Sequence, residues 1–232
     1  MSRRRVSNPL ALAVLACLLE RPMHPYEISA TLRSRGKEQS IKLNYGSLYS
    51  VVEALEKRGL IASRETTRQG RRPQRTVYEI TEAGTGEFEE WLAELLSVPV
   101  RDFTALEAGL SLMAGLPPDE VARLLEDRAV RLRIELRGLE AADQVGEEMG
   151  LPELFSIENS YRHAILSAEL AFVTGLAARI RDSSLEGTKT WRRIHELRAQ
   201  GVSFEQISTD PVRYLGEEGR LLQSPPAAPP GQ

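Results

Sequence analysis

Residues 44–61 read NYGSLYSVVEALEKRGLI, and this stretch predicts one helix with a defined beginning, a defined end and two different faces. Asn44 is a good N-cap because its side chain can accept a free backbone N–H of the first turn. Gly59 is expected just after the helix, where a left-handed residue commonly ends it. The apolar stripe follows the spacing of a helix and consists of Leu48, Val51, Val52 and Leu55.

The opposite side of this helix is small, hydroxylated and poor in charge near its beginning. Gly46 and Ser50 lie opposite the stripe, with Ser47 and Tyr49 beside them, and the acid Glu53 follows. Such a face suits a helix that enters a DNA groove. An ordinary amphipathic helix has a similar pattern, so the rest of the chain has to decide between the two.

Composition points to a soluble globular protein with an anionic partner for its first third only. The 232 residues are 41% hydrophobic and 27% charged, and no apolar run approaches the length of a membrane span. We find no signal peptide, and the single cysteine, Cys17, fits a reducing cytoplasm. Residues 1–80 carry 15 Lys and Arg against 7 Asp and Glu, whereas the remainder carries 15 against 26. The alternative is chance segregation of charges on solvated faces.

The first 97 residues predict a winged helix-turn-helix. Helices are expected from Pro9 to the Arg21-Pro22 pair and from Tyr26 to Arg35, joined by short turns to the helix described above. Strand-like runs at 60–67 and 76–80 then predict a hairpin. Its loop has no acidic residue and carries four arginines: Arg68, Arg71, Arg72 and Arg75. These side chains would reach phosphates or a minor groove. The alternative is a solvated turn with no contact to DNA. Thr81 caps a fourth helix.

The second half reads as helices alone, so the expected fold class is mainly α with a small β wing. Long amphipathic segments follow Pro118 and run over about 153–181, and no strand completes their core. Because two or three such helices do not easily close a core alone, packing against a second copy predicts a homodimer. We expect a DNA-binding domain at 1–98, a helical dimerisation domain at 99–183 and a partly disordered C-terminal extension at 184–232.

No motif for catalysis or metal binding stands out. HExxH, paired CxxC, GxSxG and the phosphate-binding GxxxxGK[ST] are all absent from the sequence. The three histidines, His24, His163 and His195, are scattered, and each fits a surface or packed position better than a ligand position. We therefore predict a protein that is not an enzyme and that needs no cofactor or metal.

Three segments together resemble the PadR family of bacterial transcriptional regulators. Residues 22–28, PMHPYEI, resemble its P-x-x-G-Y-E-L opening, with Pro25 where the family usually has Gly. NYGSLY followed by LEKRGLI resembles its recognition-helix segment, although Glu53 and Ala54 stand where the family is often basic. GRRPQRTVYEITEAG at 70–84 resembles its wing and the start of the next helix. The helical second half is similar in pattern to the longer subfamily, whose C-terminal helices dimerise, and residues after Ser183 extend beyond the usual family end.

The helix face, the arginine loop and the resemblance together give a set of candidate DNA-binding residues, of which the resemblance implies Tyr26 and Tyr49. Tyr26 and Tyr49 become candidates for phosphate contacts, and their rings could instead only pack the turn. Tyr45, Ser47 and Ser50 become candidates for base edges or nearby phosphates, and the wing arginines for electrostatic affinity. The complete set is Tyr26, Asn44, Tyr45, Gly46, Ser47, Tyr49, Ser50, Arg68, Arg71, Arg72 and Arg75.

The resemblance also implies a small-molecule effector, because members of the family often respond to one. A pocket is expected where the fourth helix meets the dimer helices, and the aromatic residues there also fit an ordinary core: Trp91, Phe103, Phe155, Tyr161 and Phe172. The expected function is that of a cytoplasmic, dimeric repressor on a palindromic operator. The alternative is a winged-helix module that binds proteins and does not read DNA directly.

Overall fold

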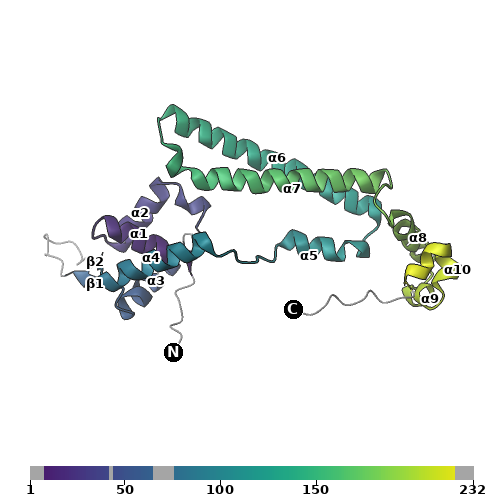
Figure 1. Ribbon diagram of the computed structural model, residues 1–232, viewed down its shortest axis with the longest axis horizontal. Helices are drawn as coiled ribbons and strands as arrows, with labels where there is room; N and C mark the ends of the chain where they lie inside the picture. Colours follow the sequence, from purple (N-terminus) through teal and green to yellow (C-terminus); the bar gives the residue numbers. More distant parts are fainter. Residues whose placement is uncertain (1–7, 42–43, 65–75, 223–232) are drawn as a thin grey trace. The chain divides into compact units, whose positions relative to one another are not determined.

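The computed structural model describes residues 8–41, 44–64 and 76–222 (Figure 1). The chain divides into two compact units, Met1–Asp102 and Phe103–Gln232. Helices dominate both units, and the first also holds one antiparallel two-stranded sheet. The predicted fold class, mainly α with a small β wing, is confirmed; the three domain boundaries drawn from the sequence stay predictions.

The first unit is a winged helix-turn-helix whose elements begin where the sequence places its caps. The Asn8 side chain accepts the Leu10 N–H at 3.0 Å, and the Asn44 side chain accepts the Gly46 N–H at the same distance. The elements are α1 (Pro9–Glu20), α2 (Pro25–Ser34), the 3-10 turn η1 (Lys37–Gln39), α3 (Tyr45–Lys57), β1 (Ile61–Arg64), β2 (Val77–Ile80) and α4 (Glu82–Ser97).

Helix α1 is the centre of the first core. Seven of its 12 residues are buried, and the apolar faces of α2, α3 and α4 belong to the same cluster. Cys17 lies in this core, where burial raises the pKa of its thiol to about 11. A thiol with so high a pKa holds little thiolate at neutral pH, so Cys17 acts as a small core residue.

The base of the wing is fastened to the turn between α1 and α2. β1 and β2 pair with Ile61 opposite Ile80, and the backbone of Met23 exchanges two 3.0 Å hydrogen bonds with that of Tyr78. Gly84, in the first turn of α4, lies so close to the chain that an added Cβ would meet the Leu60 carbonyl oxygen at 2.0 Å. Only glycine permits this approach.

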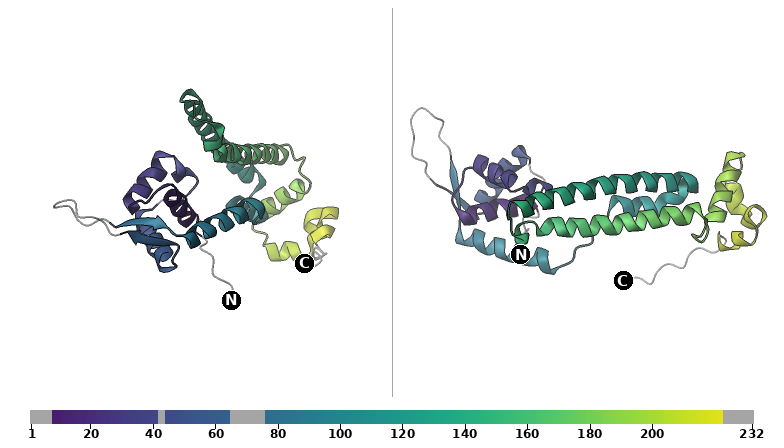
Figure 2. Two further views of the ribbon diagram at one scale, coloured as in Figure 1. Left: turned by 60° about the vertical axis from the view of Figure 1, so that its left-hand side comes forward. Right: turned by 90° about the horizontal axis from the view of Figure 1, so that it is seen from above.

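The second unit is built on a long hairpin of two helices, α6 and α7, which run side by side (Figures 1 and 2). A second apolar cluster lies between them and includes Leu125, Leu132, Val173 and Ile180. The elements are α5 (Ala105–Leu112), η2 (Met113–Gly115), α6 (Pro118–Glu148), η3 (Glu153–Phe155), α7 (Ile157–Arg181), α8 (Thr188–Ala199), α9 (Phe204–Thr209), α10 (Pro211–Leu215) and η4 (Gly216–Leu222).

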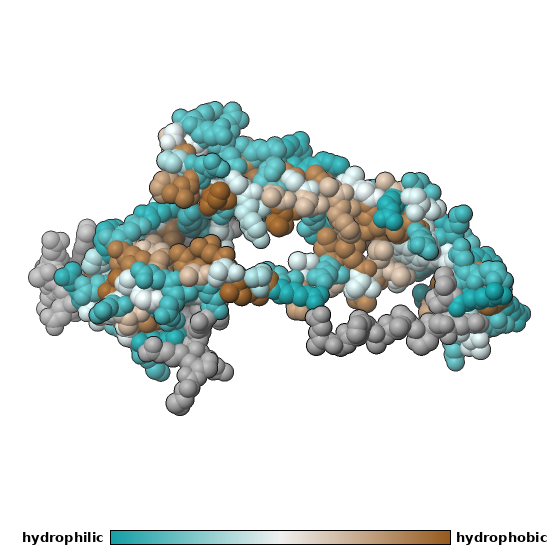
Figure 3. All heavy atoms as spheres, viewed as in Figure 1, coloured by the Kyte–Doolittle hydropathy of each residue, from teal (hydrophilic) through white to brown (hydrophobic). Residues whose placement is uncertain are grey.

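Helix α7 carries two apolar faces, and only one is buried. Val173, Leu176, Ala177 and Ile180 pack toward α6. The stripe that the sequence suggested is largely exposed and includes Ile157, Tyr161, Ile165 and Phe172. Figure 3 shows hydrophobic atoms at the surface of this helical hairpin. By length and composition α7 could also cross a membrane, a test that the core helix of a soluble protein passes too.

The segment after Ser183, where the sequence signal is weak, forms α8, α9, α10 and η4 up to Leu222. Trp191 of α8 donates its indole N–H to the Leu116 carbonyl at 2.8 Å, and the Arg192 guanidinium pairs with Asp119. These contacts fasten α8 to the beginning of α6. The disorder predicted for residues 224–232 concerns a segment that lies outside the described part of the chain.

Candidate nucleic-acid interface

The rotation of α3 is fixed by its buried side. Leu48, Val52 and Leu55 are buried in the first core, so the opposite side of the helix has to face solvent. The Asn44 cap satisfies one N–H of the first turn and sets where the helix begins. The residues of α3 that the sequence predicted for DNA contacts therefore lie at the exposed beginning of this helix.

That exposed end is small and neutral. Gly46, Ser47 and Ser50 are all exposed, and the first turn contains no acidic residue. They border a hollow of about 650 Å³, which is lined by Asn8, Asn44, Gly46, Ser47, Ser50, Val51 and Ala54. The hydroxyl of Ser50 donates to the Gly46 carbonyl at 3.1 Å, so its free lone pairs are left to accept hydrogen bonds from outside.

Two tyrosines of the first unit are exposed, one on α2 and one on α3. Tyr26, in the first turn of α2, is 58% exposed, and Tyr49 of α3 is 46% exposed. Within the described ranges neither phenol has a hydrogen-bond partner. Because both side chains are exposed and no described residue pairs with either hydroxyl, each can donate to a phosphate oxygen.

Farther along α3 the face becomes acidic. Glu53 is exposed, and its charge, with that of Glu56, adds to burial in raising the pKa of Tyr78 on the neighbouring strand. A carboxylate in this place repels phosphates. The part of α3 suited to nucleic acid is therefore its first two turns.

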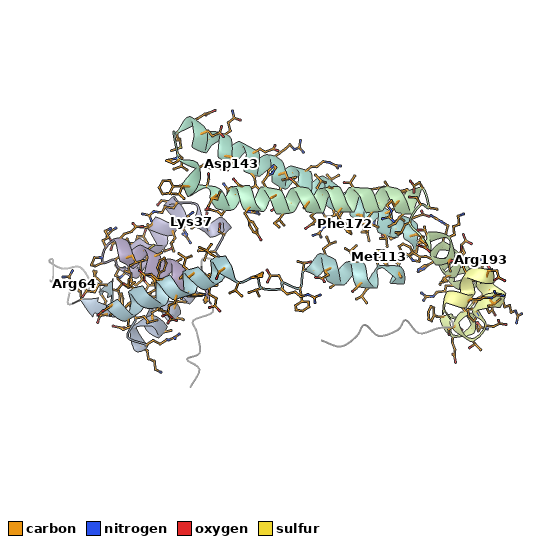
Figure 4. The ribbon with its side chains drawn as sticks, in the orientation of Figure 1. Lys37, Arg64, Met113, Asp143, Phe172 and Arg193 are labelled. Carbon is orange, nitrogen blue, oxygen red and sulfur yellow. The ribbon has the colours of Figure 1, made fainter. Side chains whose placement is uncertain are left out.

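Several predicted residues cannot be placed. Tyr45 is the first residue of α3, and the structure does not describe its side chain. Arg68, Arg71, Arg72 and Arg75 lie outside the described residues. Arg64, labelled in Figure 4, ends β1 where the chain enters that loop, and its guanidinium pairs with Glu79 at 3.1 Å.

One positioning residue escaped the sequence analysis, which read His24 as a surface or packed histidine. The His24 imidazole is the N-cap of α2, because its Nδ1 accepts the Tyr26 N–H at 3.1 Å. Glu27 returns the contact by accepting the backbone N–H of His24 at 2.8 Å. The spacing of this capping box is visible in the sequence, but histidine is not among the residues that usually occupy an N-cap.

The five aromatic residues predicted for a ligand pocket are divided between the two units. Trp91 is buried in the core of the first unit. The other four belong to the second unit and are exposed: Phe103, Phe155, Tyr161 and Phe172. A groove of about 480 Å³ in the second unit is lined mainly by leucines, and none of the five borders it.

Metal ligands are not gathered either. Within residues 8–41, 44–64 and 76–222, no group of three or more His, Cys, Asp or Glu side chains could hold a metal ion. The binding surface of the first unit is instead the capped beginning of α3, with its accessible hydroxyl groups.

Comparison with known proteins agrees with this geometry. Residues 14–90 match the family described as the transcriptional regulator PadR-like family. No curated protein matches the chain by sequence.

Three solved structures share the fold at low sequence identity. The virulence activator AphA of Vibrio cholerae has a TM-score of 0.56 at 15% identity, covering 75% of this chain and 99% of its own. The PadR-like regulator BC1756 of Bacillus cereus has a TM-score of 0.52 at 15% identity, with the same coverages. Bacillus subtilis PadR in complex with operator DNA has a TM-score of 0.51 at 18% identity and covers 72% and 99%. Residues 14–90 therefore resemble the PadR-like family of transcriptional regulators, in agreement with the motifs in the sequence, and the three solved structures share the fold of the chain.

Proposed function

We propose that this regulator binds double-stranded DNA as a homodimer and represses transcription from a palindromic or near-palindromic operator. The observation that carries the proposal is the exposed, small and neutral beginning of α3, held in place by the Asn44 cap and by a buried apolar side. A helix end of this kind can approach base edges closely in a major groove.

In this proposal, recognition of the base sequence belongs to α3, and most of the affinity for DNA belongs to the wing. Ser47 and Ser50 contact bases or nearby phosphates, and hydroxyls alone discriminate bases weakly. Tyr26 and Tyr49 contact phosphates. Most of the electrostatic affinity comes from the wing, through Arg68, Arg71, Arg72 and Arg75.

Dimerisation is supported by the uncovered apolar face of α7. Tyr161 is 71% exposed and Phe172 is 54% exposed, an arrangement that a second copy would bury. Two-fold symmetry would place two α3 helices in half-sites about one helical turn apart. Bacillus subtilis PadR, which shares the fold, has been crystallised in complex with operator DNA, and we propose the same class of ligand for this chain.

The proposal includes release of the operator by a small-molecule effector and activity in the bacterial cytoplasm. The residues that the sequence predicted for the effector pocket are Trp91, Phe103, Phe155, Tyr161 and Phe172. Heat-stability shifts with a small library of aromatic and drug-like compounds test the effector directly, since a ligand that binds the folded state raises the unfolding temperature. No shift with any compound would favour a constitutive regulator.

The decisive experiment is footprinting on the DNA upstream of the regulator's own gene. We expect a two-fold symmetric footprint from the folded protein at low salt. Changing Ser50 to Ala should alter the preference at one or two base pairs, whereas the matched change of Ser97 to Ala, on the exposed end of α4, should not. A folded dimer that leaves no footprint would support the rival function, a winged-helix module that binds proteins.

The wing is tested separately through salt. Changing Arg71 and Arg72 to Ala should weaken binding to every sequence and flatten the slope of log K against log salt by up to about 1 per lost contact. Unchanged slope and affinity would mean that the wing does not lie on phosphates.

A further inference from the structure

The second unit contains a groove between α5 with η2 on one side and the first half of α6 on the other. Its volume of about 480 Å³ falls within the range of roughly 300–1,000 Å³ that is usual for small-molecule sites. Met113, labelled in Figure 4, lies at the α5 side. Its apolar lining consists of Leu106, Gly109, Leu110, Met113, Leu116, Val121, Leu124, Leu125 and Leu132.

Three charged side chains also border the groove, and two of them are already neutralised. Arg128 donates to Glu169 at 2.6 Å, and Glu135 accepts a hydrogen bond from Arg162. Arg131 has no hydrogen-bond or ion-pair partner among the described residues. The groove therefore combines an apolar floor with one arginine that has no ion-pair partner among residues 103–222.

The connection between α5 and α6, next to the groove, is held by α8. The Leu116 carbonyl accepts from Trp191, the Ala114 carbonyl lies 3.0 Å from His195 Nε2, and Arg192 pairs with Asp119 next to Pro118. These three contacts fix the short connection between α5 and α6. A groove whose walls are fixed before binding loses less free energy in ordering itself around a ligand.

We propose that this groove binds an amphipathic monoanion, a molecule with an apolar body and one carboxylate or comparable acid group. The body lies on the leucines, and the acid group pairs with Arg131 through charge-assisted hydrogen bonds. The site differs from the aromatic set suggested by the sequence. Its use as a signal rests on the effector of the proposed function, whereas binding itself does not.

The probe is octanoate, with 1-octanol as the uncharged control of equal chain length. Both are titrated calorimetrically into the full chain without DNA, so a failure of DNA binding leaves the result unaffected. We expect octanoate to bind more tightly than octanol. Changing Arg131 to Gln should weaken octanoate about tenfold and leave octanol unchanged, because only the charge pair is lost.

Two further variants sharpen the test. Arg133 is an exposed arginine two residues along α6, about 200° around the helix, and Arg133→Gln should change neither affinity. Gly109→Leu adds a side chain at a groove position where a new Cβ meets nothing within 4 Å, so it should fill the groove and abolish binding of both probes. Far-UV circular dichroism checks that this variant folds; Arg131→Gln remains decisive if it does not.

Three results would overturn the proposal. Octanoate and octanol could bind the wild-type chain equally, or not at all. Arg131→Gln and Arg133→Gln could have the same effect on octanoate. Finally, Gly109→Leu could dissociate the dimer in sedimentation and leave octanoate binding intact, which would assign the groove to a second copy of the chain.

Discussion

The two units of this chain differ in how much of the apolar surface of their helices is buried. In the first unit, α1 has seven of 12 residues buried, and α2, α3 and α4 pack around it. In the second unit, α7 has four of 25 residues buried, and several of its large apolar side chains remain exposed, among them Ile165 and Phe172. One unit buries most of its central helix within the chain, and the other leaves an apolar face of α7 exposed.

The difference lies in how apolar residues are arranged around each helix. On α7 the exposed stripe with Ile165 and Phe172 lies roughly 80° around the axis from the buried residues Val173 and Ile180. A two-helix hairpin can cover only one of these faces. The second face remains available, and we propose that it binds another copy of the same helices.

The chain supplies a separate reporter for each unit. Its only two tryptophans are Trp91, buried in the first core, and Trp191, partly buried against the second. Replacing one with Phe makes the fluorescence of the other specific to its own unit. The stability of each unit can thus be measured separately in the full chain.

The largest effect is expected on dimerisation. Changing Ile165 and Phe172 together to Asp places two charges on the proposed interface and removes its apolar contact, which should raise the dimer dissociation constant roughly 100-fold or more. Sedimentation velocity over a concentration series measures the change. Trp91 fluorescence should show the first unit unaltered in its stability.

The matched control is Thr174→Asp, which adds a charge to an exposed position of α7 away from the stripe. It should leave the dissociation constant nearly unchanged. If the control weakens the dimer as much as the double variant, net charge is responsible and the stripe is not the interface.

A smaller effect tests how tightly the first unit is closed. An added Cβ at Gly84 meets the Leu60 carbonyl at 2.0 Å, whereas one at Gly86, half a turn later in α4, meets nothing within 4 Å. Gly84→Ala should therefore lower the free energy of unfolding by about 1–3 kcal/mol, and Gly86→Ala should raise it by roughly 0.5–1 kcal/mol. Urea unfolding followed by Trp91 measures both.

Equal effects of these two alanines would show that the beginning of α4 has room to move away from Leu60. The first unit would then be less closely packed than its geometry indicates, and the contrast with the second unit would be weaker.

Local signals in the sequence were sufficient for most of the fold. Capping side chains such as Asn8 and Asn44, and the left-handed glycine Gly59 with φ of +72°, act within a few residues of their own position and can be read directly. The burial of α7 could not be read in the same way. A periodic pattern shows that a helix has an apolar side, but it does not show which of two sides the same chain covers.

The candidate site was predictable to a similar degree. The exposed end of α3 follows from its buried stripe, so Gly46, Ser47 and Ser50 could be located in advance. The His24 cap was missed because its acceptor is an imidazole nitrogen, whose role depends on the path of the turn. The helices after Ser183 were underestimated because their contacts, such as Trp191 with Leu116, join residues far apart in sequence.

A cap variant tests whether His24 helps to close the first unit. His24→Ala removes the acceptor of the Tyr26 N–H and should cost about 1 kcal/mol of stability by Trp91 fluorescence, whereas His24→Asn keeps an acceptor and should recover most of it. Equal stabilities of the alanine and asparagine variants would mean that the cap contributes nothing and that the ring acts only through packing.

The smallest expected effect concerns an ion pair at the edge of the first core. Arg35 donates to both carboxylate oxygens of Glu20, at 2.5 and 2.8 Å, and this hydrogen bonding lowers the pKa of Glu20 below its ordinary value of 4.5. A lowered pKa in the folded state gives stability above that ordinary value, and the stability is lost as the pH falls through the folded-state pKa. Because the pair is about half exposed, Glu20→Gln should cost only about 0.2–1 kcal/mol at pH 7 and almost nothing near pH 2. Glu90→Gln, an exposed change on α4, provides the control. A cost for Glu20→Gln that stays the same at both pH values would show that the pair's charge does not stabilise the closed unit.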